Sequence, residues 1–439
     1  MTATVTSDIR TGVNLAEAGS AMYGLARTLY PVCRSITGDG VRETLRQIGA
    51  HIPLKVHEVP TGTPVYDWTV PKEWNIRDAY VRTSAGQKII DFAKSNLHVL
   101  NYSIPVRKTV SLAELRGHLY TLPDQPDLIP YKTSYYQERW GFCISAKLAD
   151  TLQEDTYEVV IDSSLENGNL SYGECFLPGA STKEILISCH VCHPSLCNDN
   201  LSGIALCTFL AKHLQGRLLR YSYRFIFIPG TIGAITWLAL NEATAARVRH
   251  GLVAANVGDS GMMHYKKSRR GNAEIDRAVA HVLRHADKPH EIIDFLPYGY
   301  DERQFCSPGI NLPVGSLTRT PYGRYPEYHT SADDLGLIRP EYLADSFMTY
   351  LAVFDVLENN RRYLNLNPKC EPQLGRRGLY RQLGGNVENS EAELAMLWVL
   401  NLSDGDHALL DIAERAGMPF EQIAAAAKLL VHNDLLKAC

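Results

Sequence analysis

The sequence lacks the features that mark membrane, nucleic-acid-binding and secreted disulfide-rich proteins. No run of about 18 apolar residues occurs, so we expect no membrane-spanning helix. The formal charge is −4, whereas a nucleic-acid-binding domain carries a basic excess. The opening residues, MTATVTSDIRTG, lack the charged and apolar regions of a signal peptide. We therefore expect a cytoplasmic protein whose 10 cysteines are reduced thiols.

The length and the pattern of apolar residues predict an α/β protein of two to three domains. The 439 residues are 45% hydrophobic and 21% charged, which is ordinary for a chain with a buried core. Continuous apolar runs of strand length alternate with helical patterns, which favours a mainly parallel or mixed sheet with helices on both faces. The strand-like runs are EILISCH, RFIFIP and GLVAANVGD, and the helical ones are SGIALCTFLAKHL and GAITWLALNEATAARV.

The flanking segments divide the chain further. We predict a discontinuous α/β domain of residues 1–56 and 130–364, into which a small β-rich subdomain, residues 57–129, is inserted. The runs AYVRTS, KIIDFA and HVLNYSI indicate its strands. Residues 365–439 read as a winged helix-turn-helix. Its second helix is rich in alanine and poor in base-reading side chains, so we expect a packing module or a homo-oligomer contact and no nucleic-acid partner. The alternative is a DNA-binding regulator with a ligand-sensing domain.

Polar side chains gather where the predicted strands end. His190 ends one strand, Asp199 lies in the loop before the next helix, and Asp259 follows another strand. In open α/β sheets, ligands bind outside the carboxyl ends of the strands. Imidazole and carboxylate are good zinc ligands, and a carboxylate can bridge two ions. The pattern therefore indicates a metal site at this edge of the sheet.

The order of these residues resembles that of the co-catalytic zinc aminopeptidases. The motif is His190 followed by Asp199-Asn200-Leu201-Ser202-Gly203. The resemblance implies that Asp199 bridges two ions, that His190 is a terminal ligand, and that Asp259 and His329 complete the set. It also implies a cis bond between Asp199 and Asn200.

A nearer resemblance, over almost the whole chain, is to bacterial aminopeptidase-like proteins with an inserted β subdomain and a C-terminal winged helix. Thr133–Tyr136, Trp140–Cys143, Cys192–Ser195 and Tyr325–Ser331 carry it. Some members are associated with polysaccharide or secondary-metabolite biosynthesis. The resemblance implies a metal-dependent hydrolase of an amide or peptide-like bond, with one or two zinc ions. Iron and manganese also suit such ligands.

The sequence departs from the aminopeptidase pattern at the catalytic base. Gly230 stands where the family has its base Glu, and Thr231 where it has a zinc-ligating Glu. General acid–base help contributes about 10²–10⁴-fold to a rate. Either another acid replaces it, with Glu302, Asp301 and Glu327 as the candidates, or the substrate supplies a proton, or the protein binds a ligand without catalysis.

Further residues have predicted roles around this site. Cys192 occupies the position of the family's orienting Asp, so His193 is either a metal ligand or the partner that orients His190. For a small-molecule or peptide-like substrate, we predict binding by side chains whose planar forks or rings suit carboxylates and sugars. These are Arg34, Arg319, Tyr322, Arg324 and Tyr328. The alternative for the loop residues among them is a solvated surface.

Overall fold

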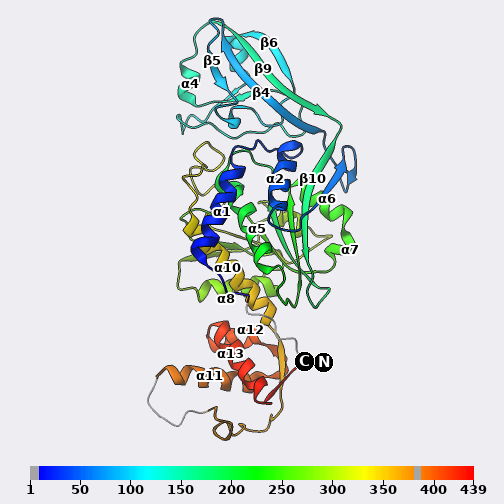
Figure 1. Ribbon diagram of the computed structural model, residues 1–439, viewed down its shortest axis with the longest axis vertical. Helices are drawn as coiled ribbons and strands as arrows, with labels where there is room; N and C mark the ends of the chain where they lie inside the picture. The colour runs from blue at the N-terminus through cyan, green and yellow to red at the C-terminus, as the bar shows by residue number, and fades with distance from the viewer. Residues whose placement is uncertain (1–8, 380–386) are drawn as a thin grey trace.

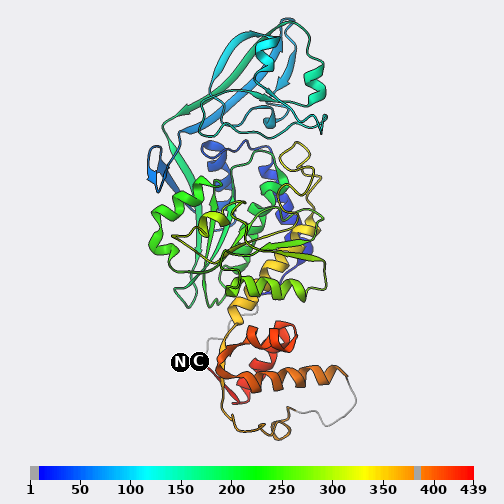
Figure 2. The ribbon, with the colours of Figure 1, turned by 180° about the vertical axis from the view of Figure 1, so that it is seen from behind.

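The computed structural model describes residues 9–379 and 387–439, which form three units stacked along the long axis (Figure 1). A small β unit lies at one end, an α/β unit in the middle, and a helical unit at the other end, and the view from behind shows the same order (Figure 2). Across the described residues, no helix combines the length and apolarity needed to span a membrane.

The central unit is built on an eight-stranded mixed sheet. β11 pairs in parallel with both β12 and β13, so these three strands end at the same edge. β13–β16 and β14–β15 are also parallel, whereas β1–β10, β10–β12 and β14–β16 are antiparallel. In sheet order the strands are β1 (Lys55–Pro60), β10 (Asn169–Leu177), β12 (Ser222–Ile228), β11 (Glu184–His190), β13 (Val248–Ala254), β16 (Val314–Thr318), β14 (Met263–Lys266) and β15 (His290–Ile293). The predicted fold class is confirmed.

Helices cover both faces of the sheet, as the alternation of buried side chains requires. Along β11, Ile187 and Cys189 enter one core, whereas Leu186 enters the other. The first core also takes residues of α1 (Leu15–Leu29), α2 (Asp39–Gly49), α5 (Gly203–Leu214), α8 (Glu274–Arg284) and α10 (Pro340–Asn359). The second takes residues of α6 (Ile232–Leu240), α7 (Glu242–Ala245) and α9 (Glu302–Phe305).

The inserted unit is a four-stranded antiparallel sheet in the order β5-β4-β9-β6. Its strands are β4 (Glu73–Thr83), β5 (Lys88–Asp91), β6 (Val106–Ser111) and β9 (Thr156–Glu166). This differs from the predicted boundaries of 57–129, because β9 pairs with β4 over its full length while β1 joins the central sheet. The run HVLNYSI is also not a regular strand, since the turn η1 (Asn96–His98) precedes only isolated bridges at Val99 and Asn101.

Short elements surround the inserted sheet and its junction with the central unit. They are β2 (Pro64–Val65), β3 (Trp68–Thr69), α3 (Leu112–Arg116), β7 (Leu119–Tyr120), β8 (Phe142–Cys143) and α4 (Ala146–Asp150). The connection brings residues 130–136 beside the loop that follows β16, where Pro130 and Thr330 form an antiparallel bridge. The edge of the central sheet that holds the strand ends therefore lies next to this junction.

The C-terminal unit packs three helices on a small sheet in the order β18-β17-β19. It contains β17 (Arg362–Asn365), η3 (Gly375–Arg377), α11 (Val387–Leu402), β18 (Asp404–Ala408), α12 (Leu409–Ala416), α13 (Phe420–His432) and β19 (Leu436–Ala438). Arg277 of α8 pairs with Asp411 and Glu414 of α12, and Arg10 pairs with Glu421 at the start of α13. The end of α13 that would read bases in a DNA-binding homologue is thus turned toward the central unit, and the absence of a nucleic-acid partner stays a prediction.

Candidate metal centre

The candidate centre begins at the end of β11, where His190 is fully buried. The following turn, η2 (Cys197–Ser202), brings Asp199 back to His190. Asp333 holds this turn by accepting the backbone N–H groups of Asn198 at 2.6 Å and Asp199 at 3.0 Å. The Asp199–Asn200 peptide bond is cis, as the resemblance implies.

His190, His193 and Asp199 bring one ligand atom each within 4.8 Å of one another. Asp199 Oδ1 lies 2.8 Å from His190 Nε2, while Oδ2 lies 2.9 Å from His329 Nε2 and 3.9 Å from His193 Nε2. The two oxygens of the Asp199 carboxylate thus face different imidazoles, and its role as a bridging ligand stays a prediction. The donor set of imidazoles and a carboxylate fits zinc.

The protonation states of the neighbouring groups also suit a metal ion. Burial lowers the pKa of His193 well below its usual value, so the imidazole is neutral and can donate a lone pair. Burial raises the pKa of Tyr300 well above its usual range. The protonated phenol donates to Asp199 Oδ2 at 2.6 Å, and its ring stacks on His190 with centroids 4.5 Å apart. Tyr300 therefore orients both residues.

Aromatic rings enclose the histidines on the remaining sides. Tyr328 stacks on His329 with ring centroids 3.9 Å apart. Tyr131 lies 5.1 Å from His193 and 5.0 Å from His329, and its backbone N–H donates to the His329 carbonyl at 2.7 Å. Tyr328 was predicted near the substrate, whereas sequence reasoning missed Tyr300, Tyr131 and Asp333. The only signal for Asp333 in the sequence is that it lies four residues after His329.

Asp259, the fourth predicted ligand, lies outside the group of His190, His193 and Asp199. Its Oδ1 accepts the Thr320 hydroxyl and the Gly261 N–H, each at 2.6 Å. Its Oδ2 accepts the Asn198 amide at 2.8 Å. To coordinate a metal, the Asp259 carboxylate would have to exchange some of these bonds, and its role stays a prediction.

The end of β12 has no carboxylate of its own, but one lies beside it. A Cβ atom built on Gly230 would lie 3.7 Å from each carboxylate oxygen of Asp301 and 3.2 Å from His190 Cβ. Asp301 is fully buried, and neither of its oxygens has a hydrogen-bond partner. Glu302 instead forms an ion pair with Lys266. Thr231 precedes α6 and leaves this strand end without an acid.

The predicted substrate residues are divided between the centre and other surroundings. Arg34 is buried beside the centre, where its Nε donates to the His193 carbonyl at 2.8 Å. Tyr322 packs edge-on against Tyr300 with centroids 5.3 Å apart. Arg319 differs from the prediction, because its guanidinium pairs with Asp345 of α10 at 2.9 Å. Arg324 is exposed and pairs with Glu291 at 2.7 Å.

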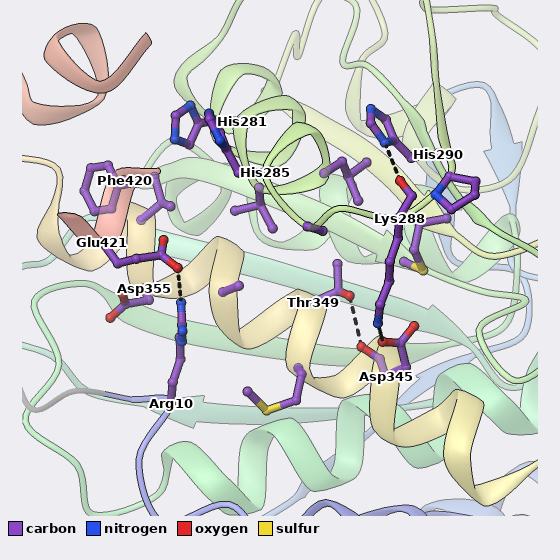
Figure 3. A pocket seen from close by; sticks show the side chains of 18 residues that line it. Arg10, His281, His285, Lys288, His290, Asp345, Thr349, Asp355, Phe420 and Glu421 are labelled. Atoms are coloured by element: carbon purple, nitrogen blue, oxygen red, sulfur yellow. Dashed lines mark hydrogen bonds and ion pairs between the residues drawn. The ribbon is translucent and has the colours of Figure 1, made fainter. Parts of the chain in front are cut away.

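A separate cavity of about 240 Å³ lies between the central and C-terminal units (Figure 3). His281 and His285 stand side by side there, with centroids 4.4 Å apart. Its Arg10 and Lys288 are already paired, with Glu421 and Asp345 respectively. Among the described residues, the cavity holds no group of three convergent metal-ligating side chains. Hydrolytic chemistry is thus better supported at the end of β11.

Comparisons with known proteins agree with this geometry. Residues 23–360 match a family model described as a domain of unknown function, DUF4910, and residues 361–438 match a winged helix-turn-helix model. A Clostridium acetobutylicum protein, provisionally named a polysaccharide biosynthesis protein with an aminopeptidase-like domain, is 56% identical over 424 residues, which is 97% of this chain and 98% of that protein.

Two solved structures are similar to this chain. A crystal structure from Clostridium acetobutylicum, provisionally described as a peptidase, superposes with a TM-score of 0.93 and 55% identity over 97% of this chain and 98% of that chain. A zinc aminopeptidase from Bacillus subtilis superposes with a TM-score of 0.56 over 77% of this chain and 94% of that one. At 13% identity, the second similarity shows the fold alone.

Proposed function

Because the chain belongs to the DUF4910 family and contains an aminopeptidase-like domain followed by a winged helix-turn-helix, we propose that it is a zinc-dependent hydrolase of an amide bond. One observation carries the proposal. His190, His193 and Asp199 are buried or nearly so, and they converge within 4.8 Å at the carboxyl end of a parallel strand. Buried imidazoles around a carboxylate are an unfavourable arrangement for a purely structural core and a favourable one for a cation.

Each residue at this site has a separate proposed role. His190 and His193 supply imidazoles, and Asp199 places one oxygen on the side of His190 and the other on the side of His329. Tyr300 fixes the Asp199 carboxylate by donating to Oδ2. Asp333 fixes the turn that carries it. When bound, zinc supplies Lewis-acid polarisation of a carbonyl and makes water easier to ionise.

The aromatic rings around His329 indicate which kind of ligand the site would accept. Tyr131, Tyr300 and Tyr328 line the histidines with ring faces and edges, which suits a compact ligand with apolar faces. The name of the relative from Clostridium acetobutylicum links that protein to polysaccharide biosynthesis. We therefore propose two classes of amide as probes, namely aminoacyl anilides and N-acetylated amino sugars.

The test combines metal analysis with turnover. We expect purified protein to hold zinc and to release amine from at least one probe, with the activity lost on dialysis against a chelator and restored by zinc. His190→Ala should lose both zinc and turnover. Zinc-free protein after reconstitution, or turnover that survives His190→Ala and chelation, would contradict the proposal.

A second candidate is a ligand-binding protein with this fold and no catalysis. Gly230 favours it, because the strand end that carries the base in the aminopeptidases carries no side chain here. It predicts zinc-dependent binding of a probe amide with no amine released over a long incubation. Amine release that a chelator abolishes would exclude it.

A further inference from the structure

Asp301 stands where the side chain missing from Gly230 would reach. A Cβ atom on Gly230 would point at the Asp301 carboxylate, since both oxygens lie 3.7 Å from it. The same Cβ atom would lie 3.2 Å from His190 Cβ, so Asp301 is beside the strand end that delivers His190. Asp301 directly follows Tyr300, which contacts both His190 and Asp199. The loop therefore carries a carboxylate to the edge of the centre.

The Asp301 carboxylate has no structural partner. It is fully buried, and both oxygens lack a hydrogen-bond partner. An unpaired buried carboxylate costs folding free energy, and such a group in a native structure indicates function or an absent ligand. Burial raises its pKa to about 7, which is the range in which a carboxylate can both accept and donate a proton at neutral pH.

Both oxygens of the neighbouring Glu302 also lack a hydrogen-bond partner, but unlike Asp301 this acid has a charged partner. Glu302 is equally buried, but Lys266 neutralises it, and Lys266 Nζ also donates to the Tyr298 carbonyl at 2.9 Å. This ion pair fixes the loop of residues 298–302. Removing a proton from, or giving one to, Glu302 would break the pair and leave Lys266 buried without its counter-charge.

We propose that Asp301 is the proton-transfer residue of the centre and replaces the Glu that Gly230 lacks. The proposal rests on the hydrolase proposed above. Asp301 accepts a proton from the attacking water as the water oxygen bonds to the amide carbon. It then delivers that proton to the amide nitrogen as the carbon–nitrogen bond breaks, so that the products are a carboxylic acid and an amine. The proton-transfer group missing at the end of β12 is thus supplied by the loop of residues 298–302.

The test uses acetohydroxamic acid, a small zinc-binding acid that loses a proton when it binds. Calorimetry of the zinc-loaded protein, in two mildly alkaline buffers of different ionisation enthalpy, measures how much of that proton reaches the buffer. In the wild type, Asp301 retains it. In Asp301→Asn, the buffer receives it, and the amide hydrolysis rate falls by about 10²–10⁴-fold. The control is the double variant Lys266→Met/Glu302→Gln, which removes the neighbouring acid together with its buried counter-charge and should release the proton to the same extent as the wild type.

Zinc affinity is measured on the same three proteins and separates the outcomes. Asp301→Asn should lose less than the roughly 10-fold that loss of a ligand-orienting partner causes. A larger loss would make Asp301 a metal ligand and overturn the assignment. Three other results would overturn it as well: unchanged proton release in Asp301→Asn, an altered release in Lys266→Met/Glu302→Gln, or no hydroxamate binding by the zinc-loaded wild type. Failure of the wild type to bind zinc would instead overturn the proposed function itself.

Discussion

The ends of β11 and β12 lie side by side in the sheet, yet they differ in chemistry. The strands pair in parallel, with His190 opposite Ile228. β11 ends in the candidate ligand His190 and leads to Asp199, whereas β12 leads through Pro229 to Gly230 and Thr231, which carry no acid. At the end of β11, the residues proposed to bind the metal lie close together in sequence. At the end of β12, the acid is Asp301, which comes from another loop. Metal holding and proton transfer are therefore separable by substitution.

The largest effect is expected at the first strand end. Asp199→Asn keeps the shape of the side chain but removes the charge that both flanking imidazoles share. We expect zinc affinity to fall by roughly 100-fold or more, beyond the effect of losing an outer partner. Competition with a chromogenic chelator measures this. Affinity within the error of the wild type would show that the metal lies elsewhere.

A swap between the two loops tests the second strand end. Gly230→Glu alone should reduce hydrolysis by about 10-fold or more, because the new side chain crowds His190 and meets Asp301. Asp301→Gly alone should lose about 10²–10⁴-fold. The double variant Gly230→Glu/Asp301→Gly should recover at least about 10-fold over Asp301→Gly, since a single carboxylate again occupies the space.

The control for the swap is Gly230→Ala, which adds the Cβ atom without an acid. The comparison between the strand ends would fail if the double variant were no better than Asp301→Gly. It would also fail if Gly230→Ala in the Asp301→Gly background gave the same recovery, because bulk rather than charge would then be responsible.

The sequence predicted what is local and could not predict what depends on distant loops. β11 and the turn of Asp199 follow from a continuous apolar run and a short motif, and both are confirmed as elements. For the acid missing at Gly230 the sequence offered both Glu302 and Asp301 but could not choose between them, because the approach of Asp301 to Gly230 joins two loops that no periodicity links. The same applies to Tyr131, which reaches His329 from the segment between β6 and β9. The pairing of β9 with β4 is likewise non-local, and so the predicted insert ended too early.

In metal-free protein, the dependence of the free energy of unfolding on pH reports whether Asp301 is buried without a partner. Its folded-state pKa is about 7, raised from an ordinary 3.8 by burial. The unfolded chain therefore ionises first as the pH rises from about 4 to about 7, and stability falls across that window and levels off above it. The free energy of unfolding falls by up to about 4 kcal/mol across this window, at roughly 1.4 kcal/mol per pKa unit.

Asp301→Asn should flatten this part of the stability profile. Urea unfolding across the window, in the presence of a chelator, measures the difference between the two proteins. Asp333, whose pKa burial raises to about 8, is present in both and cancels in the comparison. Parallel profiles for the wild type and Asp301→Asn would show that the carboxylate is solvated or paired in solution.

The smallest effect is expected far from both strand ends. Arg277→Ala removes the ion pairs of α8 with Asp411 and Glu414, which are partly exposed. We expect a loss of up to about 1 kcal/mol in the free energy of unfolding, with zinc affinity and hydrolysis unchanged. Arg277→Lys should retain part of the stability. A change in zinc affinity would mean that the C-terminal unit acts on the centre.

The central claim, that β11 delivers the metal and Asp301 stands beside it without binding it, is tested most directly by crystals of the zinc-loaded protein. An anomalous difference map at the zinc edge should show a peak in contact with His190 Nε2 and Asp199, within roughly 2.0–2.2 Å of each. The Asp301 oxygens should lie beyond that distance. A peak at His281 and His285, no peak at Asp199, or an Asp301 oxygen bound to the metal would contradict the account.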